Sequence, residues 1–287
     1  MGKINILVEG WLHFKNEIGM SLMNSDKIQF HNNRDLNIKY DWIMNLSEFK
    51  DYEIDDSTGL IFGPQIMFPA IDTNKIPTHR KYTCNVLSNW VYNLCKDINP
   101  NIDFCTLPFA VDTNRFKPSE KNGRPIIYFK YRDQKILDDV LNELGSDFII
   151  FKYHGISTSY LESDFQKAIS EAPYLIWIGT HESQGFAFQE TLSSNTPIFV
   201  IDVNSLRDEI MQGSFWQNYL PGHKLTATSA SYFDERCGLV CYPENWKENW
   251  KSFINNIKIY NPRRFVLDSL SPDACINRWV KKLNELK

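Results

Sequence analysis

The feature that most constrains the fold is a series of continuous apolar segments in the second half of the chain. Segments 125–130 (PIIYFK), 173–179 (PYLIWIG) and 196–202 (TPIFVID) are apolar at most positions, so these strands must be buried on both faces. Between the first two, residues 133–144 repeat apolar side chains at helical spacing. Buried strands that alternate with helices predict a parallel sheet covered on both sides.

Short strands are also predicted in the first half of the chain, at 4–8, 40–45, 58–63, 83–88 and 103–109. A polar segment at 116–125, with two prolines and a glycine, predicts a linker. We expect an α/β protein with a Rossmann-like domain over 1–117, a second over 118–262, and C-terminal helices over 263–287 that cross back to the first. Two doubly wound domains that face each other leave a cleft at the carboxyl ends of their strands, where ligands bind.

Composition excludes several classes of protein. The 287 residues carry a formal net charge of −4, which argues against a protein whose main role is to bind nucleic acid. Six cysteines without a C-x-x-C pair predict buried thiols in a reducing compartment. The first residues do not form a signal peptide, and no apolar run approaches the ~20 residues that cross a bilayer. We therefore expect a cytoplasmic protein.

An apolar stripe near the C-terminus has two interpretations. Trp246, Trp250, Phe253 and Ile257 recur at helical spacing. The stripe would either hold the protein at the surface of a membrane or form part of the core. The opposite helix face mixes lysine and glutamate rather than being strongly basic, which favours the core.

The segment after the strand at 173–179 carries the residues best suited to bind a ligand. Glu182 lies in a predicted loop, Gly185 stands at the start of a predicted helix, and Glu190 follows in that helix. Free amides at a helix start attract phosphate, and carboxylates accept hydrogen bonds from sugar hydroxyls. This combination predicts a nucleotide-sugar site. A surface glutamate beside a helix-start charge that favours the dipole is an equally weighted alternative.

Several blocks of sequence, in the same order, resemble the retaining GT-B glycosyltransferases of family 4 (group 1). Residues 182–190 (ESQGFAFQE) resemble the E-x7-E motif, with Pro197 seven positions after Glu190. Residues 108–118 (PFAVDTNRFKP) resemble the exit from the first domain, and 128–135 (YFKYRDQK) the opening of the second. The resemblance covers roughly residues 83 to 270, although the loop after the first strand lacks the double glycine common in the family.

The resemblance implies a role for each matching residue. Glu190 would bind the ribose of the donor, and Glu182 would face the donor sugar. Lys135 and either Lys130 or Arg132 would neutralise the departing diphosphate, with neither a metal nor another cofactor. Further donor-binding residues would be Ser183, Gln184, Gly185, Phe186, Ala187 and His154, although His154 could equally be a capping residue. On the acceptor side we expect Gly10 and His13; His13 would act on an acceptor hydroxyl or simply belong to a structural loop.

The implied activity is a metal-independent hexosyltransferase (class EC 2.4) that transfers a sugar with retention from a nucleotide-diphosphate sugar. The acceptor would be a glycan, a lipid-linked glycan, a protein or a modified nucleic-acid base. Two alternatives share the fold: a nucleotide-sugar epimerase or hydrolase, and a non-catalytic module that binds nucleotide sugars. Turnover of a panel of donors would separate all three.

Overall fold

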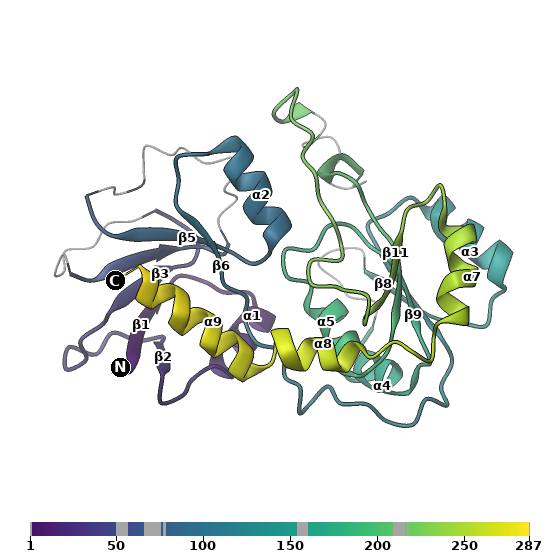
Figure 1. Cartoon of the computed structure of the whole chain (residues 1–287), viewed down its shortest axis with the longest axis horizontal. Coiled ribbons are helices and arrows are strands. Elements are labelled where there is room, and N and C mark those ends of the chain that lie inside the picture. Colours follow the sequence, from purple (N-terminus) through teal and green to yellow (C-terminus); the bar gives the residue numbers. More distant parts are fainter. Residues whose placement is uncertain are drawn as a thin grey trace. The chain divides into compact units, whose positions relative to one another are not determined.

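The computed structural model describes residues 2–49, 57–65, 76, 79–153, 160–208, 216 and 218–286. The chain forms two compact units (Figure 1). The first unit contains Met1–Asp112 and Ser269–Lys287, and the second contains Thr113–Asp268. The sequence-based boundaries were 117/118 and 262/263, so the structure assigns residues 113–117 and 263–268 to the second unit.

The first unit is a parallel sheet of six strands in the order β2-β1-β3-β4-β5-β6. Its elements are β1 (Ile4–Glu9), α1 (Phe14–Ser21), β2 (Ile28–His31), β3 (Trp42–Asn45), β4 (Gly59–Phe62), β5 (Tyr82–Val86), α2 (Asn89–Ile98), β6 (Phe104–Thr106) and α9 (Pro272–Glu285). The strand order reverses at β1, because β2 pairs with one edge of β1 and β3 with the other. This is the doubly wound pattern that the apolar runs predicted.

The last helix of the chain packs on this first sheet, as the yellow ribbon of α9 shows in Figure 1. Its Trp279 is fully buried and stacks on Phe109, with 5.9 Å between ring centroids. The Trp279 ring also makes a T-shaped contact with Phe30, and its indole N–H donates to the Pro108 carbonyl over 2.9 Å. The C-terminal helix is therefore part of the core of the first unit.

The second unit contains a parallel sheet of five strands in the order β11-β10-β9-β7-β8. Its elements are β7 (Ile126–Lys130), α3 (Gln134–Leu144), β8 (Ile149–Tyr153), α4 (Glu162–Glu171), β9 (Leu175–Ile178), α5 (Phe186–Ser193), β10 (Ile198–Ile201), the 3-10 helix η3 (Leu206–Asp208), β11 (Gly238–Cys241), α7 (Trp246–Asn255) and α8 (Pro262–Ser269), which ends at the boundary. Here the strand order reverses at β7, between β8 and β9. Both sheets are Rossmann-like, as predicted.

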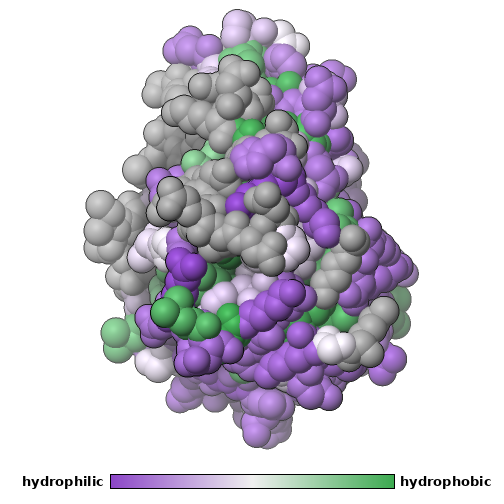
Figure 2. All heavy atoms as spheres, turned by 90° about the vertical axis from the view of Figure 1, so that its left-hand side faces the viewer, coloured by the Kyte–Doolittle hydropathy of each residue, from purple (hydrophilic) through white to green (hydrophobic). Residues whose placement is uncertain are grey.

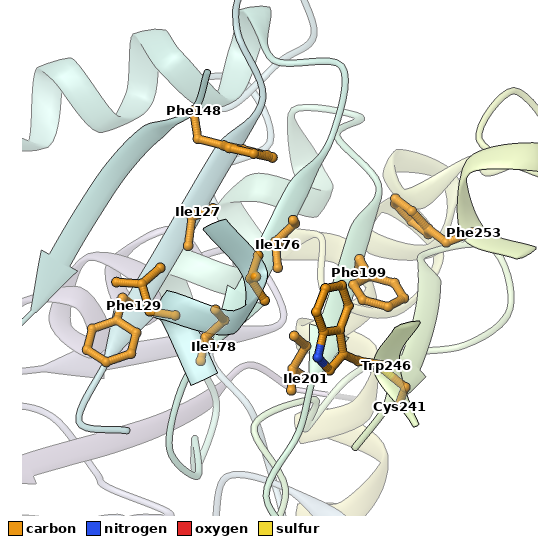
Figure 3. Close-up of a cluster of buried hydrophobic side chains, with 12 residues drawn as sticks. Ile127, Phe129, Phe148, Ile176, Ile178, Phe199, Ile201, Cys241, Trp246 and Phe253 are labelled. Carbon is orange, nitrogen blue, oxygen red and sulfur yellow. The ribbon is translucent and has the colours of Figure 1, made fainter. Parts of the chain in front are cut away.

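The apolar stripe at 246–257 belongs to the core of the second unit. Trp246 and Phe253 on α7 point toward the sheet, where they meet Phe199 of β10 (Figure 3). Trp250 and Ile257 pack against the same cluster. These contacts confirm the core interpretation of the stripe.

Among the described residues, no helix is both long and apolar enough to cross a bilayer. On the face drawn in Figure 2, hydrophilic residues predominate, and the hydrophobic ones form small separate areas.

Candidate functional site

The candidate site lies at the carboxyl end of the second sheet, where the strand order reverses. Strand β7 ends at Lys130 and pairs with β9, which is followed by a loop over 179–185 and then by α5. In doubly wound sheets, ligands bind at the crevice beside such a reversal. The topology therefore brings Lys130 next to the loop that carries Glu182.

Lys130 and Glu182 form a close ion pair. The ammonium Nζ of Lys130 donates to Oε1 of Glu182 over 2.6 Å, and the two side chains are only 20% and 15% exposed. Burial acts to lower the pKa of Lys130, but the charge and hydrogen bond of Glu182 outweigh it and raise the pKa. The Tyr153 ring lies below the same ammonium, with 5.3 Å from Nζ to the centroid. Lys130 is therefore positively charged in a site with limited access to water.

The backbone of Glu182 is fixed by a loop over 228–231, to which the sequence alone assigned no role at the site. Its N–H donates to the carbonyl of Thr228 over 3.1 Å, and the Ser231 hydroxyl donates to its carbonyl. Asp202, at the end of β10, holds this loop, because its carboxylate accepts from Ser229 N–H and Oγ, each over 2.7 Å, and from the Thr228 hydroxyl. The sequence feature that could have indicated this loop is T-S-A-S at 228–231. Its clustered hydroxyl side chains are typical of segments that hydrogen-bond to backbone groups.

Gly185 allows Glu182 to lie close to the start of α5. Gly185 is the N-cap of the helix and has a φ of +80°, in the left-handed region that favours glycine. A Cβ added to Gly185 would lie 3.0 Å from the Cβ of Glu182. Since glycine has no side chain, the N-cap residue itself offers no side-chain oxygen to the amides of Phe186 and Ala187. Such amides are suited to an anionic ligand.

Two glutamines stiffen the same loop. Gln184 and Gln189 are buried, and their side chains hydrogen-bond over 3.2 Å. The Gln189 amide also donates to the Gln184 carbonyl. Gln184 therefore has a structural role that its place in the predicted donor site did not anticipate, whereas Ser183 is exposed.

Glu190 lies on α5 and is 3% exposed. Burial raises the pKa of Tyr160, and the negative charge of Glu190 adds to the rise. The Tyr160 hydroxyl meets that of Tyr128 on β7, with 3.0 Å between the oxygens. The sequence alone did not single out these tyrosines: Tyr128 belongs to a segment predicted only as a strand, and Tyr160 lies just before α4.

The structure separates the two candidates for the cation after β7. Arg132 is 6% exposed and donates to the carbonyls of Gly179 and Ile201, over 2.9 and 3.2 Å. Its guanidinium therefore joins the ends of β9 and β10, whereas Lys130 pairs with Glu182. Lys135 is exposed in the first turn of α3, where its amide donates to the N-cap Asp133.

His181 is a further member of the site that the sequence did not single out. Burial and the positive charge of Lys130 lower the pKa of His181 to about 4. The imidazole is therefore neutral at physiological pH. A neutral histidine beside the ion pair adds a hydrogen-bonding group without a second positive charge.

The remaining residues proposed from the sequence are His154, Gly10 and His13. His154 falls outside the described residues. Gly10 and His13 belong to the first unit, where His13 is the N-cap of α1 and its Nδ1 accepts from the Lys15 amide over 3.3 Å. The His13 amide donates to Oε1 of Gln65 over 2.7 Å.

The chain was compared with known proteins. No protein-family model matches the sequence, and no curated protein matches it closely enough to count as a relative. Its structure is similar to that of WaaB, a lipopolysaccharide outer core galactosyltransferase in the apo form, with a TM-score of 0.54 and 10% identity over 99% of both chains.

Longer proteins are similar to a lesser degree. A mutant of S. aureus TarM, solved with fondaparinux, α-GlcNAc-glycerol and UDP, matches with a TM-score of 0.49 and 10% identity over 80% of this chain, which spans 56% of TarM. Sucrose-phosphate synthase from Thermosynechococcus elongatus matches with a TM-score of 0.47 and 10% identity, over 86% of this chain and 74% of that protein. The likeness to WaaB, across nearly the whole of both chains, shows that this chain has the two Rossmann-like domains of the GT-B glycosyltransferases.

Proposed function

We propose that the protein is a glycosyltransferase that moves a sugar from a nucleotide-diphosphate sugar to a hydroxyl acceptor. The observation that carries the proposal is the Lys130–Glu182 ion pair beside the start of α5, whose N-cap is a glycine. A fixed cation and helix amides suit a diphosphate, and a carboxylate suits sugar hydroxyls. The second carboxylate, Glu190, follows on the same helix and is assigned to the ribose.

The reaction follows from these roles. The bond between the anomeric carbon and the diphosphate oxygen breaks, and the diphosphate leaves with the electron pair. The acceptor oxygen forms its bond on the same face of the sugar, so the configuration is retained, and its proton goes to the departing phosphate. Lys130, assisted by Lys135 and the α5 amides, stabilises the charge that develops on the diphosphate. Retention and membership of family 4 rest on the E-x7-E resemblance.

We also propose that this reaction needs no metal ion, because Lys130 and the helix amides supply the positive charge that a cation supplies in other enzymes. Activity should then survive an excess of EDTA. Loss of activity on chelation, with recovery on addition of manganese or magnesium, would refute metal independence. We place the activity in the cytoplasm, a location supported by six cysteines that are all free and buried.

The decisive experiment is a screen of UDP- and GDP-sugars for transfer or hydrolysis, followed by Lys130→Gln. We expect the variant to lower turnover by roughly 100-fold, the loss typical of removing one preorganised electrostatic group. Lys247→Gln is the matched control, because Lys247 forms an ion pair of 2.9 Å with Asp139 but is 49% exposed on α7. The proposal fails if no donor is turned over, or if Lys130→Gln behaves like the control.

A further inference from the structure

The first unit contains a cavity of about 540 Å³ that the donor chemistry does not use. It lies where the strand order of the first sheet reverses, because its lining includes Val8 at the end of β1 and Leu46 just after β3. Cavities of about 300–1,000 Å³ are the usual size for small-molecule sites, and doubly wound sheets bind ligands at this reversal. A second cavity of about 320 Å³ shares the lining residues Glu17, Met20 and Asn32, so the site is extended.

An exposed tryptophan borders the cavity. Gly10 follows β1 with a φ of +96°, and a Cβ there would lie 3.2 Å from Oγ of Ser47. The chain turns at this glycine, and the next residue, Trp11, lines the cavity with 69% of its surface exposed, while Leu12 is buried. A large aromatic side chain held at a cavity in water is typical of a binding surface rather than of a core.

The polar groups of the cavity have one sign of charge. Glu9 and Glu17 contribute carboxylates, and Asn32 contributes an amide. No lysine, arginine or histidine is found among the described lining residues. The two carboxylates repel phosphates and other anions, but they accept hydrogen bonds from hydroxyls.

We infer that this cavity binds a neutral carbohydrate, whose hydroxyls donate to Glu9 and Glu17 and whose C–H face lies on the Trp11 ring. The extended shape fits more than one sugar unit. If the proposed glycosyltransferase activity is correct, on which this step rests, the acceptor presents an uncharged sugar at the site of transfer. Acidic glycans and the phosphates of nucleic acids are disfavoured there.

The test is a binding experiment without any nucleotide. A panel of immobilised neutral, amino-substituted and acidic oligosaccharides is probed with the full chain, and the best neutral one is titrated by calorimetry. We expect retention of neutral members, and affinity about tenfold lower in both Trp11→Ala and Glu17→Gln. Leu36→Ala is the matched control, because Leu36 is a hydrophobic residue of the same unit that is 88% exposed outside the cavity lining. Circular dichroism checks that all variants are folded.

The inference is overturned if no oligosaccharide is retained, if only amino-substituted or acidic members bind, or if Trp11→Ala binds as tightly as Leu36→Ala. Failure of the proposed activity would look different. In that case no nucleotide sugar would be turned over, while neutral oligosaccharides would still bind through Trp11. Donor turnover that depends on Lys130 but is accompanied by no Trp11-dependent binding would overturn only the carbohydrate site.

Discussion

At the scale of single residues, the ion pair of Lys130 and Glu182 explains how both charges are kept with little exposure to water. Removing one partner of such a pair leaves the other uncompensated, so each depends on its neighbour. A bound diphosphate would offer Lys130 a second anion, and the Glu182 carboxylate would then accept hydrogen bonds from sugar hydroxyls. The ion pair therefore holds a positive charge and a hydrogen-bond acceptor side by side.

Substitution of the two glutamates should affect different kinetic constants. Glu190 is assigned to the ribose, far from the breaking bond, so Glu190→Gln should raise the KM for the donor roughly ten- to a hundredfold with a smaller effect on kcat. Glu182 is assigned to the sugar, which gains positive charge as the diphosphate leaves, so Glu182→Gln should mainly lower kcat. Donor titrations of the two folded variants measure this split. Values close to the wild type for both would show that the protein works elsewhere.

His181 should make stability depend on pH. Its pKa is about 4 in the folded protein and near 6.5 in the unfolded chain. As pH falls through 6.5, the unfolded chain takes up a proton that the folded protein does not, so stability is full above pH 6.5 and declines toward pH 4. Between pH 7 and pH 5 the loss is at most ~2 kcal/mol. Urea unfolding of the wild type and of His181→Gln at both pH values measures this loss. An equal loss of stability in the two proteins would exclude His181 as the cause.

At the scale of elements, the loop from β9 to α5 depends on the left-handed conformation of Gly185. Gly185→Ala should cost about 1–2 kcal/mol of stability through its backbone and should also displace Glu182, since the new Cβ meets that side chain at 3.0 Å. Gly145→Ala is the control for backbone strain, because Gly145 also has a positive φ, +86°, with open space around its Cβ position. Its ψ of −175° places it in a region open essentially to glycine alone, so chemical unfolding should show at least as large a loss in Gly145→Ala. Donor turnover should nevertheless fall only in Gly185→Ala. Full turnover in Gly185→Ala would contradict the role of this contact.

Elements with a strong pattern could be predicted from sequence, and those stabilised by distant partners could not. Strands β9 and β10 are apolar at every position and were found. The edge strand β2 (IQFH) alternates polar and apolar residues over only four positions, so it was missed. In the same way Lys130 and Glu182 were each proposed from motifs, whereas Asp202 and Ser229 are joined only by the fold, 27 positions apart. Local sequence carries no record of such pairs.

At the scale of the whole molecule, each unit has its own core, and the first is completed by residues from the end of the chain. Trp279 on α9 closes the first core against Phe30 and Phe109. Trp246 is likewise buried in the core of the second unit, and its indole N–H donates to Asp139 over 3.0 Å. Stability is therefore expected to have two local sources rather than one.

Replacing these two tryptophans one at a time should show whether the two cores are stabilised separately. Either Trp279→Ala or Trp246→Ala removes a buried ring and should cost about 3–5 kcal/mol, since the cavity left behind closes only in part. Hydrogen exchange in native conditions should then show faster opening in β1, β2 and α9 for Trp279→Ala, but in β7, β10 and α7 for Trp246→Ala. Because α9 begins about 240 residues after the end of β2, faster exchange in β1 and β2 after a change in α9 would demonstrate that this helix is part of the first core. If both variants accelerated exchange equally throughout the chain, the two cores would unfold as one cooperative body, and the division into units would have no thermodynamic meaning.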